Sequence, residues 1–300
     1  MTRRNESPAS GRRSPRRRTP SNVIPLNRSL SIPILYEDSH VLAIDKPNGW
    51  MTTTARWSHT KQNLQREIEI AITKRDPWVM QKQIRFLRFV HRLDRETSGV
   101  LLLAKSRHAL TKVGKLFSEQ RIQKLYLCVV RGSVPVDAWK CTAPISPSKN
   151  AENRMKVDLK EGQNSTTLFR CLKTSPSRSL IIANPQTGRT HQIRVHLAAS
   201  GHAIIGDPLY GERSEKPSFR QESRSSRQQM GLRAWAVRFR YSPKHKPITI
   251  LASSDAFLRQ FAPHSRLPTL NEVFNSVEEL NQSSELFVSK TGRLPNGPSA

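Results

Sequence analysis

Cysteine is scarce in this chain of 300 residues, which contains only Cys128, Cys141 and Cys171. An odd number at such wide spacing forms neither a disulfide framework nor the paired CxxC ligands of a structural zinc site. The sequence also lacks an apolar run long enough to span a membrane, and its N-terminus lacks the apolar core of a secretory signal. We therefore expect buried thiols in a reducing compartment, and we take the protein to be cytoplasmic.

Loops that bind nucleotide phosphates are missing as well. The glycines at 201, 206 and 211 mark turns and do not form a GxGxxG motif after a strand, and the chain has no P-loop. Residues 91–94 contain the letters of a kinase catalytic loop, but in the wrong order and without a DFG motif. The sequence therefore predicts no cofactor.

Acidic residues are few relative to basic ones. Lys and Arg number 50 against 23 Asp and Glu, which gives a formal charge of +27. A chain this basic attracts polyphosphates, and without a cationic amphipathic helix nucleic acid is a better candidate partner than a membrane. We expect residues 1–30, rich in Arg, Ser and Pro, to be a disordered basic arm that adds phosphate affinity, although a solvated tail without a role fits this composition equally well.

Residues 31–262 are predicted to form one folded α+β domain with many strands and few helices. We expect helices over 60–74 and 107–121 and a polar surface loop over 213–230. Residues 263–300 are predicted to form a C-terminal helix, which opens with a capping box at Thr269 and Glu272 and docks on the domain, followed by a disordered tail. The predicted strands cover 33–36, 41–45, 125–131, 165–172, 179–184, 191–197, 232–241 and 248–251.

One polar segment, HRLDRETSG at 91–99, lies between two apolar runs that are typical of short buried strands. Its aspartate, Asp94, has Arg92 and Arg95 as neighbours, and their positive charge favours the ionised carboxylate. An ionised carboxylate suits a nucleophile or a general base better than a general acid. From these residues alone, a salt-bridged turn remains the alternative.

A second segment runs from Pro185 through TGRTHQIRVHLAASGHAIIGDPLYG at 187–211. Polar and apolar residues alternate over 191–197, which predicts a strand with one polar face. His191 and His196 would then point to opposite faces, so we do not predict a zinc site there.

These two segments resemble the RluA-type family of RNA pseudouridine synthases. YEDSHVLAIDKPNGW at 36–50 and KLYLCVVRG at 124–132 are similar to further motifs of that family, in the same order. The resemblance implies a mixed, mostly antiparallel sheet flanked by helices with a central RNA-binding cleft. It also implies isomerisation of uridine in structured ribosomal or transfer RNA, without a cofactor, after the base has been flipped out of the RNA.

The resemblance also assigns roles to four residues. Asp94 would be the catalytic aspartate, acting either as a nucleophile on C1′ or as a base toward C2′. Tyr126 would stack on the uracil, and Arg189 would pair with Asp94 and orient it. Arg92 would fill the gap that the flipped base leaves in the RNA.

The chain departs from the family at Arg233-Ala234-Trp235, where the family has a His-Ala pair, and we expect no small RNA-binding module before residue 31. These departures leave the RNA target open. An RNA-binding or ribosome-assembly factor that keeps the fold without turnover is the alternative function. We expect a monomer that does not bind DNA or membranes.

Overall fold

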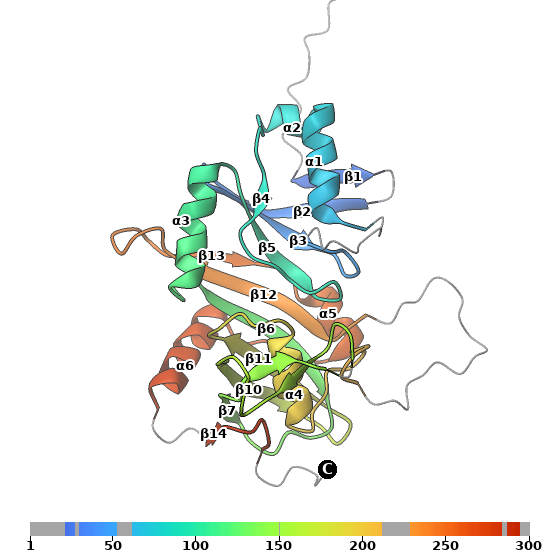
Figure 1. Cartoon of the computed structure of the whole chain (residues 1–300), viewed down its shortest axis with the longest axis vertical. Coiled ribbons are helices and arrows are strands. Elements are labelled where there is room, and N and C mark those ends of the chain that lie inside the picture. The colour runs from blue at the N-terminus through green and yellow to red at the C-terminus, as the bar shows by residue number, and fades with distance from the viewer. Residues whose placement is uncertain are drawn as a thin grey trace, which may run out of the picture.

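A computed structural model of the protein describes residues 22–27, 30–52, 62–149, 151–211, 229–283 and 287–294. Most of its strands belong to one long mixed sheet, which runs through both halves of the molecule, with helices on its faces (Figure 1). The predicted α+β class is confirmed. Residues 1–21 of the predicted arm and residues 213–228 of the predicted loop lie outside the described residues.

The strand order places segments from all parts of the chain side by side. Neighbouring strands are antiparallel except for the parallel pairs β5–β12 and β7–β14. Strand β13 (Ile248–Leu251) pairs with β12, strand β4 (Arg88–Phe89) pairs with β5, and β8 (Ile145–Pro147) and β9 (Met155–Val157) form a separate ribbon. The main order is β1 (Val23–Asn27), β2 (Leu30–Glu37), β3 (Val41–Lys46), β5 (Ser98–Ala104), β12 (Leu232–Phe239), β6 (Gln123–Arg131), β11 (Arg178–Pro185), β10 (Thr167–Thr174), β7 (Ala138–Cys141) and β14 (Phe287–Ser289).

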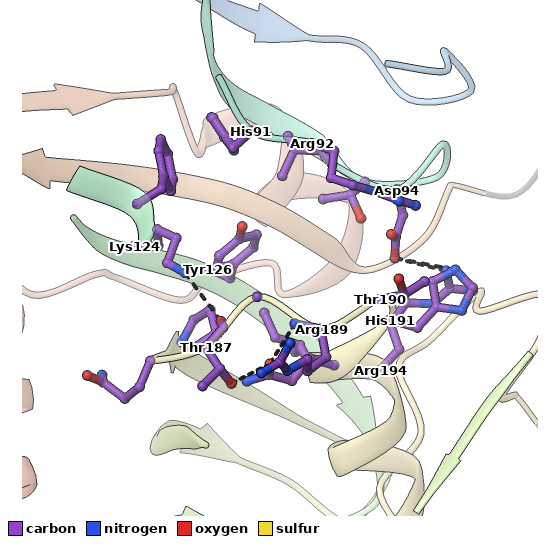
Figure 2. A pocket seen from close by; sticks show the side chains of 18 of the residues that line it. His91, Arg92, Asp94, Lys124, Tyr126, Thr187, Arg189, Thr190, His191 and Arg194 are labelled. Atoms are coloured by element: carbon purple, nitrogen blue, oxygen red, sulfur yellow. Dashed lines mark hydrogen bonds and ion pairs between the residues drawn. The ribbon is translucent and has the colours of Figure 1, made fainter. Parts of the chain in front are cut away.

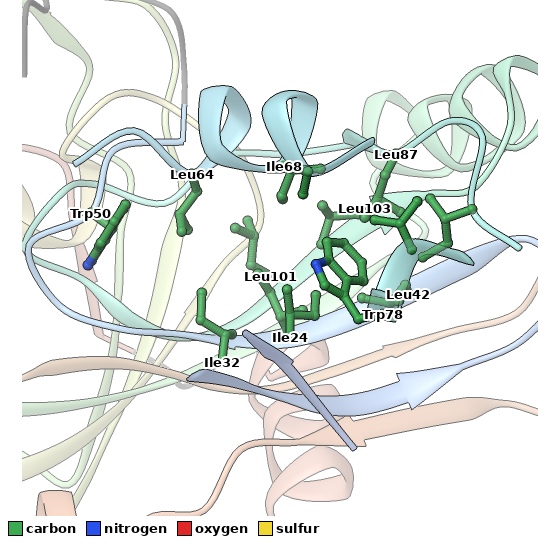
Figure 3. Packing of buried hydrophobic residues seen from close by; sticks show 14 of the residues in the cluster. Ile24, Ile32, Leu42, Trp50, Leu64, Ile68, Trp78, Leu87, Leu101 and Leu103 are labelled. Carbon is green, nitrogen blue, oxygen red and sulfur yellow. The ribbon is translucent and has the colours of Figure 1, made fainter. Parts of the chain in front are cut away.

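Strands β3 and β5 are buried on both faces. Leu42 and Leu101 pack against helices α1 (Leu64–Lys74) and α2 (Pro77–Gln81) on one face (Figure 3). Val41 and Val100 belong to a second cluster on the opposite face, with residues of α3 (Arg107–Ser118). Because both faces are covered, these strands are continuous apolar runs in the sequence rather than alternating ones.

The β5–β12 junction lies in the middle of the sheet and requires a glycine. Gly99 has φ +112°, and a Cβ atom at this position would lie 2.0 Å from the carbonyl oxygen of Ala234. The adjacent Arg233 spans the same junction: it forms an ion pair of 2.6 Å with Asp45 and donates a hydrogen bond to Ser98. The segment that carries Asp94 leads directly into this junction, so the sheet fixes where that segment ends.

Most predicted elements are confirmed, including both helices and the C-terminal helix α6 (Leu270–Gln282). The Thr269–Glu272 capping box is present, and α6 buries Val273, Phe274 and Val277 against the sheet together with α5 (Asp255–Phe261). A predicted α-helix over 107–121 and strands at 33–36, 41–45, 125–131 and 248–251 match the observed elements within a few residues.

Two of these predictions are wrong. Residues 192–199 form helix α4 (Gln192–Ala199), not a strand. Its polar side chains at 192, 194 and 196 are as buried as the apolar ones between them, so the alternation in sequence does not mark two faces. Val23–Asn27, assigned to the arm, form strand β1, because Ile24 packs in the core. One strand was not predicted: Phe287–Ser289 form β14 at the other edge of the sheet.

Candidate active site

A cavity of about 550 Å³ opens beside the middle of the sheet (Figure 2). Its walls are the 90–94 segment before β5, the end of α3, the first half of β6, and the turn from β11 into α4. The cavity size is typical of a small-molecule or single-nucleotide site. The structure therefore brings the two sequence segments singled out above to one place, as predicted.

Asp94 is held by a buried arginine of helix α4. The Nη1 atom of Arg194 donates to Oδ2 of Asp94 at 3.1 Å, while its Nε and Nη2 bind both oxygens of Asp207 at 2.7 and 2.8 Å. Burial opposes the charge of Arg194, but the hydrogen bonds and charge of Asp207, together with Asp94, outweigh it and raise the pKa of this guanidinium. Arg194 is thus a permanent cation that fixes one carboxylate oxygen, and no residue in the described ranges hydrogen bonds to the other oxygen, Oδ1.

The predicted pairing of Arg189 with Asp94 is wrong. Arg189 is exposed at the cavity rim, and its Nε donates to the carbonyl oxygen of Asn164 at 3.1 Å. The error follows from the strand assigned to 191–197: as a helix, the segment carries the second arginine of TGRTHQIR, Arg194, into the interior. The sequence alone does not show which of the two arginines, Arg189 or Arg194, binds Asp94. In the structure the buried one, Arg194, does.

A histidine, His191, also lies beside Asp94. The backbone N–H of Met155 donates to the Tyr210 hydroxyl at 2.8 Å, and the same hydroxyl is hydrogen bonded to Nδ1 of His191 at 3.0 Å. The Nε2 atom of His191 lies 3.9 Å from Oδ2 of Asp94. Burial lowers the pKa of His191, with Asp94 acting in the opposite direction, so the ring is neutral at pH 7.

Hydrogen bonds from Lys46, in the Lys46-Pro47 pair, also hold the backbone that follows Asp94. The buried ammonium of Lys46 donates to the carbonyl oxygens of Pro47, Arg95 and Thr97 at 3.1, 3.1 and 2.7 Å. Burial lowers the pKa of Lys46 to about 7, against the opposing effect of Asp94 and Glu96. This lysine shapes the backbone that presents Asp94 and has no direct contact with the cavity.

Tyr126 lines the cavity from strand β6, as predicted. Figure 2 shows its ring between Lys124 and Asp94. Burial, and then the negative charge of Asp94, raise the pKa of Tyr126, so its hydroxyl stays protonated at neutral pH. A protonated, partly buried aromatic ring facing a cavity is suited to stacking on a base.

Arg92 lies at the mouth of the cavity and is exposed; within the described chain it forms no ion pair. A free guanidinium at this position is available to a ligand. His91, by contrast, is structural: its Nε2 accepts a hydrogen bond from the N–H of Leu102, and burial, with Lys124 second, lowers the pKa of His91 to about 3.

His196, the second histidine considered as a metal ligand, is also structural. It hydrogen bonds to Thr167 and Ser165 inside the domain. Across the parts of the chain that the structure describes, no three His, Cys, Asp or Glu side chains are grouped as metal ligands. No helix in these same ranges is long and apolar enough to cross a membrane.

An arginine-bound carboxylate beside a tyrosine, at the bottom of a cavity with exposed arginines at its rim, defines a site for chemistry on a negatively charged substrate. Comparison with known proteins identifies the class: residues 40–199 match the family described as RNA pseudouridylate synthase. The chain therefore belongs to this family of enzymes, which isomerise uridine to pseudouridine in RNA.

Curated relatives and solved structures agree with this assignment. "Ribosomal large subunit pseudouridine synthase C" of Buchnera aphidicola is 33% identical over 230 residues, covering 76% of this chain and 69% of that protein. The protein of the same name from Vibrio vulnificus is 35% identical, over 73% of this chain and 64% of its own length. The chain thus spans about two thirds of these relatives. Human RNA Pseudouridylate Synthase Domain Containing 1 has the same fold, with a TM-score of 0.60 over 82% of this chain and 94% of that chain, at 24% identity.

Proposed function

We propose that this protein converts uridine to pseudouridine in ribosomal RNA, with Asp94 as the catalytic residue. The observation that carries the proposal is the fixed geometry of Asp94, which lines the cavity: Arg194 binds its Oδ2 atom, and no described residue hydrogen bonds to its Oδ1 atom. The choice of ribosomal RNA rests on the names of the relatives, and transfer RNA is the second candidate. The formal charge of +27 suits either polyanion.

The reaction moves a bond without any net gain or loss of atoms. The C1′–N1 bond of uridine breaks, and its electron pair leaves with the uracil; C5 then bonds to C1′, the C5 proton is lost and N1 takes a proton. Two roles of Asp94 fit a free Oδ1 atom: attack on C1′, or removal of the C2′ proton. Arg194 supports both, because its hydrogen bond holds the carboxylate oriented before the substrate arrives.

Tyr126 and Arg92 would complete the site. The ring of Tyr126 provides a surface for the uracil while it turns between its two bonds to the ribose. The target nucleotide must leave the RNA stack to reach this depth, at a cost of roughly a few kcal/mol. The exposed Arg92 at the cavity mouth is placed to occupy the gap, because a planar guanidinium both stacks on bases and binds phosphate.

We further propose that the protein acts in the cytoplasm as a monomer and binds neither membranes nor DNA. The names of the relatives, which place their substrate in the ribosomal large subunit, support the first point. The +27 charge supports the monomer, because like-charged copies of the chain repel one another.

Release of tritium from RNA that contains 5-tritiated uridine tests this function, because the C5 hydrogen leaves during the reaction. We expect the full chain to release tritium from a large-subunit ribosomal RNA transcript, and Asp94→Asn to release none while binding the RNA with unchanged affinity. Asp255→Asn, an exposed aspartate on α5, is the matched control and should keep full activity. RNA binding without release by the wild type, on ribosomal and transfer RNA alike, would mean that the protein is a binding factor instead.

A further inference from the structure

One cation in the cavity has no part in the site described so far. Lys124 is on β6, two positions before Tyr126, and its Nζ atom donates one long hydrogen bond, 3.3 Å, to the carbonyl oxygen of Thr187 (Figure 2). Among the described residues, no carboxylate forms a salt bridge with it. An ammonium group has three N–H donors, so two of those on Lys124 are open to a ligand.

The surroundings of Lys124 make this charge costly to hold without a partner. His91, which lines the same cavity, is neutral, and the hydroxyl of Tyr126 beside Lys124 is protonated. Phe117, stacked on His91 with ring centroids 4.7 Å apart, closes the same wall. Burial lowers the pKa of Lys124 to about 8. A partly buried cation with open donors gains most from a hydrogen-bond acceptor that is negatively charged or becomes so.

The position of Lys124 indicates which acceptor this is. Residues two apart on a strand point to the same face and are about 7 Å apart, so a base stacked on Tyr126 presents an edge to Lys124. Figure 2 shows Asp94 on the opposite side of Tyr126, where the ribose would lie. RNA phosphates would have other partners in the exposed Arg92 and Arg189 at the rim.

We propose that Lys124 donates a hydrogen bond to a carbonyl oxygen of the target uracil and stabilises the negative charge of the ring after it leaves C1′. When the C1′–N1 bond breaks, the electron pair is shared between N1 and the two carbonyl oxygens, O2 and O4. The ammonium keeps its proton throughout, so the balance of the reaction is unchanged. This inference rests on the proposed uridine isomerisation and names the residue that would bind the leaving base.

The sequence contains a signal for Lys124. The KLY at 124–126 places lysine and tyrosine at a spacing of two on a strand, and therefore on the same face. That this face of β6 lines the active-site cavity is seen only in the structure.

Single-turnover kinetics of the full chain with saturating RNA test the proposal. The variants are Lys124→Met, which has a similar unbranched side chain without charge, Lys124→Arg, and Lys244→Met as a control for loss of one exposed positive charge that does not line the cavity. Each is tested on RNA with uridine, 2-thiouridine or 4-thiouridine at the target position, because sulfur is a poor hydrogen-bond acceptor. Loss of one such donor typically slows chemistry about 10²-fold.

We expect Lys124→Met to lower the rate constant about 100-fold with RNA affinity changed less than about threefold. Sulfur at the contacted oxygen should slow the wild type but give little further slowing in Lys124→Met, and the position that does so identifies O2 or O4. Equal effects of sulfur in wild type and variant would overturn the proposal, as would weaker RNA binding with an unchanged rate, which would indicate a phosphate contact.

A variant that does not fold leaves the test intact, because the proposal is also overturned if neither thiouridine slows the wild type. The result is separate from that of the proposed function. Wild type that is inactive on every RNA refutes the function, whereas active wild type with fully active Lys124→Met refutes only the role of this lysine.

Discussion

Replacing Arg194 with methionine should damage both the stability and the activity of the protein. Arg194 forms three short hydrogen bonds, two to Asp207 and one to Asp94, and its side chain is only 1% exposed. The Asp207 side chain is 0% exposed, so Arg194→Met leaves a buried negative charge without its counter-charge. Breaking a buried pair in this way costs about 3–5 kcal/mol.

This loss of stability should lower the melting temperature by roughly 6–20 °C, because 1 kcal/mol corresponds to about 2–4 °C in a domain of this size. In a double variant, adding Asp207→Asn to Arg194→Met removes the unpaired negative charge and should restore part of the lost stability. It should not restore activity, since Asp94 remains without its orienting donor. We expect the single-turnover rate to fall about 10²-fold in both variants.

Arg189→Met is the matched control, because it removes the same type of side chain from an exposed position in the turn before α4. Its stability should stay within about 0.5 kcal/mol of wild type, and its effect should be confined to RNA affinity. Thermal unfolding and single-turnover kinetics of the variants decide the matter. Equal stability of Arg194→Met and Arg189→Met, or loss of chemistry in Arg189→Met alone, would refute the assignment of Arg194 to Asp94.

Three further predictions follow from particular contacts. Gly99→Ala should cost more than about 3 kcal/mol in denaturant unfolding, since its Cβ would overlap the Ala234 carbonyl at a positive φ; a stable variant would contradict the close approach of β5 and β12. Activity should fall as the pH rises through about 8, because Lys124 must be protonated to donate; Lys124→Arg, charged at every accessible pH, should abolish that fall, and an identical profile would count against it. Deleting residues 1–21, which keeps β1 whole, should flatten the dependence of RNA affinity on log salt concentration by several units; an unchanged slope in filter binding would mean that the arm does not contact phosphate.

The sequence predicted those parts of the fold in which local pattern and burial agree. Strands β3 and β5 are covered on both faces, so their apolar runs in the sequence match their surroundings in the structure. Helices α1 and α6 have capping residues, Asn63 and Thr269, and each has an apolar face against the sheet. The segment around Asp94 was correctly placed as a turn that enters a buried strand.

The errors lie where polar residues are buried. Helix α4 carries Gln192, Arg194 and His196 into the interior, each satisfied by hydrogen bonds to other segments. A polar–apolar alternation in such a segment resembles a strand, and the arginine that binds Asp94 could be assigned only once the helix was known. Asp207 binds the same arginine as Asp94 but is far from Asp94 in the sequence. Tertiary packing brings these residues together, and no local sequence pattern indicates it.

Mapping of pseudouridine in total RNA tests the central claim most directly. The map is compared among cells that carry the wild-type gene, a deletion, or the Asp94→Asn variant at equal protein level. We expect at least one pseudouridine in large-subunit ribosomal RNA that is present with the wild type and absent in both other strains. A site that is lost on deletion but retained with Asp94→Asn would contradict the role of Asp94, and a map unchanged by the deletion would contradict the proposed activity itself.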